Sequence, residues 1–235
     1  VEEMSAILEC INLAKNFNSL MAVSNLNLKL ESGRIIGLLG PNGSGKTTLI
    51  KMISGLLTPA SGNLLINGME PGVETKKIVS YLPERTYFNN AMKVSEILNL
   101  FSDFYEDFDR AKAEDMLRRL DVNPALKFKT LSKGTKEKVQ LVMVMARRAK
   151  LYLLDEPIGG VDPAAREYIL DTVISNYAEG ASVLISTHLI SDVERVLNDF
   201  IFLRYGQLVM QGNVQQVCSE QGKSLDEIFR EVFRC

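Results

Sequence analysis

The chain has 235 residues, of which 46% are hydrophobic and 24% are charged, and its formal net charge is −2. This length and apolar content suffice for one substantial core, so we expect one domain, or one domain with a subdomain. The near-neutral charge excludes attraction of the whole protein to nucleic acid or to an anionic membrane. The three cysteines lie far apart, which favours neither a disulfide framework nor a zinc site and is typical of a reducing, cytosolic compartment. No apolar run approaches the roughly 20 residues that a membrane-spanning helix needs.

The first third of the chain has the patterns of strands separated by turns. Val23–Leu30 alternates apolar with polar residues, which predicts a half-buried antiparallel strand. Ile35–Leu39 is apolar throughout, as in a parallel strand buried on both faces. Asn67-Gly68 indicates a hairpin turn in a small β layer beside the main sheet. The predicted strands are Ile7–Leu13, Val23–Leu30, Ile35–Leu39, Leu64–Ile66 and Ile78–Leu82, with a helix at Thr47–Ser54.

The pattern changes to helical spacing after about residue 92. Helices are predicted at Val94–Tyr105 and Asp109–Leu120, and Asp109 is a plausible N-cap. A further helix at Lys136–Ala149 is apolar nearly all round from Val139 to Ala146, which predicts that it is buried. Because no strand interrupts them, we expect these helices to form a subdomain. The predicted division is a core made of residues 1–91 and 150–235 and a helical subdomain of residues 92–149.

The segment Lys127–Lys138 carries five lysines against one glutamate. Proteins that bind single-stranded nucleic acid add stacking aromatic residues to such charges. No aromatic series accompanies these lysines, so they indicate a solvated basic face rather than a nucleic-acid site.

The last third returns to strands alternating with helices. Asp162 precedes Pro163, a combination typical of an N-cap followed by the first helical position. The predicted strands are Leu151–Leu154, Ala181–Ser186 and Phe200–Arg204, and the predicted helices are Asp162–Tyr177, Ile190–Leu197, Val214–Ser219 and Ser224–Phe233.

The segment Gly40–Thr48, GPNGSGKTT, has the pattern of a phosphate-binding P-loop between a strand and a helix. Its glycines let backbone N–H groups surround an anion, and the start of the following helix adds its positive dipole. Lys46 supplies a charge for the β and γ phosphates, and the Thr47 hydroxyl can bind Mg²⁺. The residues expected to hold the nucleotide are Gly40, Asn42, Gly43, Ser44, Gly45, Lys46, Thr47 and Thr48.

Polar residues follow four apolar strands, and the carboxyl ends of parallel strands form one ligand-binding edge. Asp155 can hold Mg²⁺ through water, and Glu156 can accept the proton of the water that attacks the γ-phosphate. His188, the single histidine, can reach the same phosphate. These residues, with Lys46, are the predicted catalytic and metal-binding groups of an ATPase. A P-loop kinase is a weaker reading, because a carboxylate beside Asp155 suits water as the acceptor.

The segment Leu131-Ser132-Lys133-Gly134-Thr135 resembles the LSGGQ signature of ATP-binding cassette (ABC) transporter ATPases. Together with the P-loop, LYLLDEP, Asp162 and His188, the resemblance covers almost the whole chain in the family's order. It implies a RecA-like P-loop NTPase fold: an α/β core with a mainly parallel sheet, an antiparallel β layer and an inserted helical subdomain. The family's signature has Gly and Gln where this chain has Lys133 and Thr135.

The resemblance also implies roles for single residues. Phe17 corresponds to the aromatic residue that stacks on adenine, and Ser132 and Gly134 to the residues that contact the γ-phosphate held by a second subunit. Asp162 corresponds to a residue in a loop that crosses the dimer interface. Glu84 stands where the family has the Gln that touches Mg²⁺ and relays to the membrane subunit, so it is a predicted metal ligand.

The function that the resemblance implies is ATP hydrolysis by an ATP-dependent homodimer, or by a heterodimer with a second ABC ATPase. This dimer would drive an integral membrane permease from the cytoplasmic face of the cell membrane. Likeness to drug- and lantibiotic-resistance ATPases favours export over import. The alternative is a soluble ABC-type ATPase that serves assembly, for example of iron–sulfur clusters. No further C-terminal regulatory domain is expected.

Overall fold

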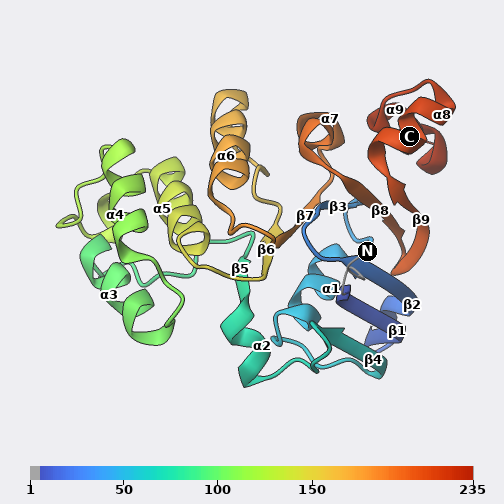
Figure 1. Cartoon of the computed structure of the whole chain (residues 1–235), viewed down its shortest axis with the longest axis horizontal. Helices are drawn as coiled ribbons and strands as arrows, with labels where there is room; N and C mark the ends of the chain where they lie inside the picture. Colours follow the sequence, from blue (N-terminus) through green and yellow to red (C-terminus); the bar gives the residue numbers. More distant parts are fainter. Residues whose placement is uncertain (1–5, 235) are drawn as a thin grey trace.

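The computed structural model describes residues 6–234, in which a six-stranded sheet forms the centre of the molecule (Figure 1). Its strands, in order across the sheet, are β5 (Val79–Leu82), β6 (Leu151–Asp155), β7 (Ser182–Thr187), β3 (Ile35–Leu39), β8 (Asp199–Arg204) and β9 (Gln207–Asn213). The first five are parallel, and β9 is antiparallel to β8. The predicted mainly parallel sheet is therefore confirmed, and its antiparallel edge strand β9 is an addition to the prediction.

A second, antiparallel sheet confirms the predicted β layer. Its order is β2 (Leu20–Glu31), β1 (Ala6–Phe17) and β4 (Ser61–Ile66). Helix α1 (Lys46–Ile53) contributes four buried side chains to the core between this layer and the main sheet. Ile36 and Leu38 of β3 face the same core, whereas their neighbours Ile35 and Leu39 face the helices on the other side. This period of two places the strand that precedes the P-loop between two apolar layers.

The helical part lies at one side of the sheet in Figure 1. It contains α3 (Val94–Phe104), α4 (Arg110–Arg119), a 3₁₀ turn (Phe128–Thr130) and α5 (Lys133–Met145). Asp109 caps α4 as predicted, since its carboxylate accepts from the Lys112 N–H. Residues Val139 to Ala146 are all buried, which confirms the predicted burial of this helix. Each such apolar side chain contributes roughly 1.5–3 kcal/mol when fully buried.

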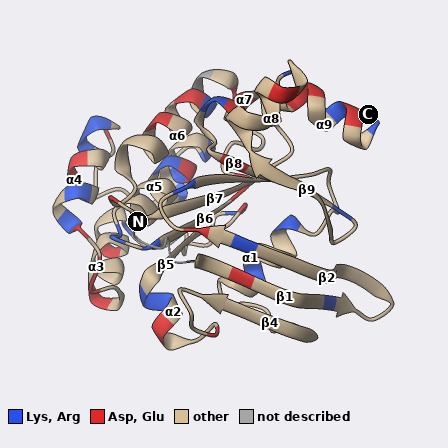
Figure 2. Cartoon of the chain, turned by 45° about the vertical axis from the view of Figure 1, so that its right-hand side comes forward, with Lys and Arg blue, Asp and Glu red and all other residues tan. Residues whose placement is uncertain are grey.

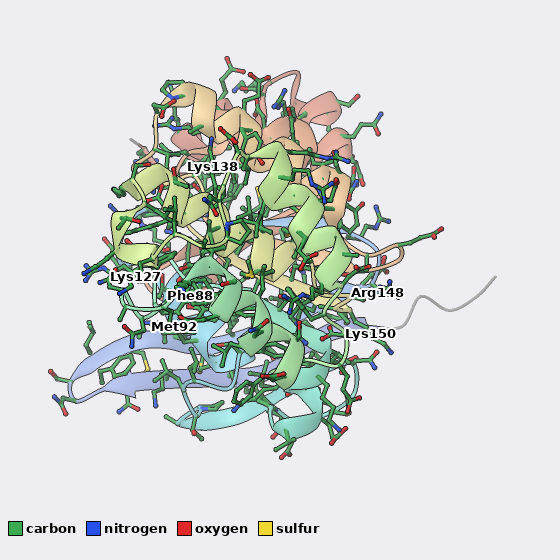
Figure 3. All side chains as sticks on the ribbon, turned by 90° about the vertical axis from the view of Figure 1, so that its left-hand side faces the viewer. Phe88, Met92, Lys127, Lys138, Arg148 and Lys150 are labelled. Carbon is green, nitrogen blue, oxygen red and sulfur yellow. The ribbon has the colours of Figure 1, made fainter. Side chains whose placement is uncertain are left out.

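Aromatic packing holds the segment before α3 against this helical part. The ring of Phe88 meets the rings of Phe101 and Phe128 edge-on, at centroid distances of 5.8 and 5.5 Å. Figure 3 shows Phe88 and Met92 near Lys127, where Lys93 and Lys127 form an isolated antiparallel bridge. Phe128, the aromatic residue within the lysine-rich segment, is thus a core residue and not a surface for stacking bases.

The remaining helices are α2 (Val73–Ile78), α6 (Pro163–Asn176), α7 (Ile190–Val193) followed by a 3₁₀ turn (Glu194–Val196), α8 (Val214–Gln221) and α9 (Leu225–Phe233). Asp162 caps α6 as predicted and accepts from the Ala165 N–H. Helix α2 was not predicted, and Ile78 belongs to it rather than to β5. Charged residues of both signs are distributed over the outer helices, whereas the β1–β2 hairpin carries few (Figure 2). Over residues 6–234, none of the helices has the length and apolar character needed to cross a membrane.

Candidate functional site

A cleft of about 1000 Å³ opens at the carboxyl ends of the central strands. One wall is the P-loop, and the β1–β2 hairpin extends this wall with Phe17, Leu20 and Met21. The lining also includes Glu84 and residues at the start of α5. The cleft therefore combines an apolar end on the hairpin with a polar end at the strand edge, as a nucleotide site requires.

The backbone of the P-loop approaches other segments so closely that two of its glycines have no substitute. A Cβ at Gly45 would lie 2.4 Å from the Ala22 carbonyl oxygen, and the φ of 103° at this residue is itself unfavourable for other side chains. A Cβ at Gly40 would lie 2.3 Å from the Leu203 carbonyl oxygen. Helix α1 begins at Lys46, so its unpaired N–H groups and positive dipole end face the cleft.

Lys46 is held over the loop by hydrogen bonds to backbone carbonyls. Its Nζ donates to Gly40 O at 2.7 Å and to Pro41 O at 3.2 Å, and it lies 3.7 Å from Glu156 Oε1. Burial lowers the pKa of Lys46, while the carboxylates of Glu156 and Asp155 oppose this shift. The ammonium group is thus fixed between the loop and the acidic edge of the sheet.

Asp155 is buried at the end of β6 and accepts two hydrogen bonds on a single oxygen. The Thr47 hydroxyl donates to Oδ1 at 3.1 Å and the Ser186 hydroxyl donates to it at 2.7 Å. Burial raises the pKa of Asp155, and the two hydroxyl groups partly oppose this. Its second oxygen, Oδ2, is buried and has no hydrogen-bond partner among residues 6–234.

This free carboxylate oxygen beside a hydroxyl group fits Mg²⁺, which prefers oxygen ligands. Within residues 6–234, His, Cys, Asp and Glu side chains do not form a group of three or more that could hold a metal ion. Such a scarcity of protein ligands is usual for Mg²⁺, which binds through one or two carboxylates, water and the phosphates of a nucleotide.

Glu156 and His188 form a pair at the mouth of the cleft. His188 Nδ1 lies 3.2 and 3.1 Å from the two carboxylate oxygens of Glu156. Glu156 has a positive φ of 49°, and its N–H donates to both the carbonyl and the hydroxyl oxygen of Ser186. Ser186 therefore fixes both acidic residues, a role that the sequence analysis missed. The available signal was a hydroxyl residue ending an apolar strand beside His188.

The predicted site residues that do not lie at the carboxyl ends of the central strands fall into two groups. Phe17, which ends β1 and is 43% exposed, and Glu84 both line the main cleft. Gly134 and Asp162 line a separate cavity of about 140 Å³, and Ser132 caps α5 by accepting from the Thr135 N–H. The fold thus brings together the residues at the carboxyl ends of the strands and leaves Ser132 and Gly134 of the signature exposed.

Two lysines of the basic segment were not predicted as cleft residues. Lys133 and Lys136 line the main cleft together with the P-loop. The Lys133 ammonium lies 3.8 Å from the position that a Cβ on Gly160 would take. The signal that could have indicated this position was that Lys133 lies within the signature and Lys136 directly after it.

Comparison with known proteins agrees with this geometry. Residues 23–159 match the family model described as ABC transporter. The chain is 32% identical to ABC transporter ATP-binding protein YtrB of Bacillus subtilis (strain 168), over 86% of this chain and 70% of that protein. It is 30% identical to SkfA peptide export ATP-binding protein SkfE of the same organism, over 95% of this chain and 96% of that protein. A solved structure of an ATP-binding subunit of an ABC transporter superposes with a TM-score of 0.85 and 30% identity, covering 97% of this chain and 99% of that one. The chain therefore belongs to the ABC transporter family, as an ATP-binding subunit that hydrolyses ATP.

Proposed function

We propose that this ATPase drives a separate membrane permease in the direction of export. The observation that carries the ATPase part of the proposal is the arrangement at the carboxyl ends of the strands: the Glu156 carboxylate lies 3.7 Å from Lys46 Nζ and 3.1 Å from His188 Nδ1, directly after Asp155. Export is supported by the relative SkfE, which is named for peptide export. No observation favours an assembly role without transport.

Each residue of the strand edge then has one task in hydrolysis. Glu156 accepts a proton from water as the water oxygen bonds to the γ-phosphorus and the bond to the β–γ bridging oxygen breaks. Lys46 offsets the negative charge of the β and γ phosphates, and His188 orients the Glu156 carboxylate. Phe17 stacks on the base, beside Leu20 and Met21. Asn42 and the N–H groups of Gly43 to Thr48 surround the phosphates.

Mg²⁺ would be held by the Thr47 hydroxyl, by Asp155 and by Glu84. A bound ion neutralises charge on the phosphates, which favours the attack of water. The partnerless Asp155 Oδ2 supports this assignment. Glu84 lines the cleft, and its charge is among the influences that raise the pKa of Asp155. A cation between these two carboxylates would relieve their repulsion.

We further propose that two cassettes close on ATP, each adding its signature to the other's P-loop. The start of α5 supports this, because Ser132 and Gly134 are exposed and nothing lies within 4 Å of a Cβ on Gly134. Such an open helix start, where the dipole of α5 has its positive end, suits a phosphate brought by another subunit. Asp162, beside Gly134 in the small cavity, would lie in the same interface.

The helical subdomain, residues 92–149, is the proposed contact for the permease. A groove of about 630 Å³ runs between it and the core, lined by Phe101 and Tyr105 on one side and by Leu56 and Tyr81 on the other. An apolar groove of this size can take a short segment of another protein. The protein would thus be cytoplasmic and attached to the inner face of the cell membrane through its permease.

Light scattering of Glu156→Gln protein tests the composite site. We expect a monomer that becomes a dimer in ATP and Mg²⁺, because binding is kept while hydrolysis is slowed. Adding Ser132→Arg should abolish the dimer by its bulk at the phosphate, whereas Ser219→Arg on the exposed face of α8 should leave it unchanged. A protein that stays monomeric in saturating ATP would contradict the closed dimer.

Coupling of ATP hydrolysis to a permease is tested by reconstitution with an adjacently encoded membrane protein, which should raise the ATPase rate severalfold.

A further inference from the structure

The groove of about 630 Å³ between the helical part and the core carries charges of one sign. The described residues that line it include no acidic residue and four basic ones, Lys51, Lys76, Arg85 and Arg147. The whole chain has a net charge of −2, so the positive excess is a local property of this groove. A cleft that is lined by one sign of charge attracts groups of the opposite sign.

Three of these four charges have no partner among the described residues. The fourth, the Arg147 guanidinium, donates to the Asp107 carboxylate at 2.9 and 3.1 Å and to backbone carbonyls of α2 and β5. Lys51 of α1, Lys76 of α2 and Arg85 of the loop after β5 make no side-chain hydrogen bond and no ion pair within the part of the chain that the structure describes. A single unpaired lysine is ordinary on a protein surface, but here three cations from separate elements converge on one groove.

Aromatic and aliphatic side chains form much of the lining. Tyr81, Tyr87 and Tyr105 line the groove, and the phenol hydroxyls of all three lack a hydrogen bond to any described residue. Leu56 and Phe101 also line it, and Leu56 and Tyr87 are 60% and 53% exposed. A tyrosine combines an apolar ring with a hydroxyl donor and is for this reason common in protein interfaces. The groove therefore offers apolar contact together with positive charge and hydroxyl donors.

We propose that this groove binds a short amphipathic helix of the permease that carries Asp or Glu beside its apolar face. The apolar face of such a helix packs into a hydrophobic groove. Its carboxylates then accept hydrogen bonds from Lys51, Lys76 and Arg85, and charge-assisted bonds of this kind are stronger than neutral ones. The headgroup of an anionic lipid would use only the charges and leave the aromatic lining uncovered. The inference rests on the proposed function, in which this groove contacts a permease, and adds the chemistry of the contacting segment.

Charge reversal in the complex with an adjacently encoded membrane protein tests the proposal. That protein is immobilised in a neutral detergent, and its affinity for the ATPase subunit is measured. Lys51→Glu combined with Lys76→Glu should lower the affinity about tenfold or more, because two attractions become repulsions. Raising the salt concentration from about 50 to about 200 mM should weaken the wild-type complex several-fold but not the complex of the charge-reversed protein. Lys77→Glu is the matched control and should bind as the wild-type protein does, since Lys77 lies on the same helix but pairs with Glu74 and does not line the groove.

A second pair of substitutions and a reversed partner complete the test. Lys51→Met combined with Lys76→Met removes the charges and keeps unbranched side chains, so it replaces the charge-reversed protein if that does not fold, and it should weaken binding several-fold. Replacing the acidic residues of one cytoplasmic loop of the membrane protein by lysine should weaken the wild-type complex and restore binding of the charge-reversed protein. Wild-type affinity in both charge variants, or the absence of any loop whose reversal restores binding, would overturn the proposal.

Two further outcomes separate this inference from the proposed function. Vesicles of phosphatidylserine without the membrane protein should bind the wild-type protein no better than vesicles of phosphatidylcholine. Binding to the anionic vesicles that is lost in the charge-reversed protein would assign the groove to lipid and overturn the proposal. Wild-type protein that does not bind the membrane protein at all would instead contradict the proposed function, and the inference with it.

Discussion

Ser186 provides a direct test of how the strand edge is built, because its hydroxyl group serves both acidic residues. In Ser186→Ala, Asp155 loses the 2.7 Å hydrogen bond, and the Glu156 N–H keeps its bond to the Ser186 carbonyl oxygen alone. A hydrogen bond to a charged group contributes about 1.5–3 kcal/mol to stability. At about 2–4 °C per kcal/mol for a chain of this size, the melting temperature without Mg²⁺ should fall by about 3–12 °C.

The same substitution should change the pH dependence of hydrolysis. The Ser186 hydroxyl lowers the pKa of Asp155 and so opposes the effect of burial, which raises it. Without Ser186 the pKa rises further, and Asp155 takes up a proton at a higher pH. Since Mg²⁺ requires the charged carboxylate, the acid limb of the pH–rate profile should move to higher pH. The maximal rate should also fall, on the order of tenfold or more, because both acidic residues lose their alignment.

Ser182→Ala is the matched control, since Ser182 is equally buried on the same strand and accepts from the Gly33 N–H at the opposite end. It should lower the melting temperature and leave the pH profile and the Mg²⁺ dependence unchanged. The account of Ser186 would be refuted if Ser186→Ala and Ser182→Ala had the same pH–rate profile, or if Ser186→Ala kept the wild-type melting temperature.

Three further substitutions test separate parts of the cleft. Because the pKa of Asp155 is raised on folding, the stability it contributes is present below its unfolded pKa and is lost as pH rises through the folded pKa. Asp155→Asn should therefore raise the melting temperature of the metal-free protein at pH 7 while abolishing hydrolysis, and a lower melting temperature would contradict the raised pKa. Phe17→Ala should raise KM for ATP about tenfold with kcat maintained, since stacking on an aromatic ring is worth about 1–3 kcal/mol, whereas Phe17→Tyr should keep the wild-type KM. Glu84→Gln should keep hydrolysis within a few-fold but raise the Mg²⁺ concentration for half-maximal rate, and superimposable Mg²⁺ titrations would remove Glu84 from the metal site.

The elements that the sequence predicted well are those whose pattern is long or strongly apolar. Ile35–Leu39 matches β3 at both ends, and Asp162-Pro163 marks the start of α6. Helix α2 has six residues, too few to show a helical period, and it ends where an apolar strand begins. Strand β9 contains consecutive apolar residues and lies at a half-exposed edge, so its alternation is weak. Its best signal was the tight turn at Tyr205-Gly206, which joins β8 to β9 as a hairpin.

Helix α5 begins earlier than its apolar composition predicts, because a capping residue sets its start. The apolar run predicted a start at Lys136, but the helix begins at Lys133 because the Ser132 hydroxyl accepts from the Thr135 N–H. The predicted end at Ala149 was also too late, since Ala146 is the C-cap. Beyond it Arg147 binds the Asp107 carboxylate and the backbone of α2. These contacts join residues 40 or more positions apart, which no local pattern contains.

The strand-edge residues could be predicted because parallel strands bring their carboxyl ends together, and the pairing of Asp155 with Ser186 in the register of β6 and β7 does this. The contribution of Ser186 itself could not be predicted, because the sequence does not show which carboxylate a serine in a strand will contact.

The most direct test of the central claim is the rate of a single turnover in Glu156→Gln protein. The account places the proton acceptor of hydrolysis at this carboxylate, beside Lys46 and His188. Labelled ATP and Mg²⁺ should bind to the variant as tightly as to the wild-type protein, while the release of phosphate should slow by about a hundredfold or more, the usual contribution of a positioned base. Phosphate release at a rate near that of the wild-type protein, with ATP fully bound, would contradict the account.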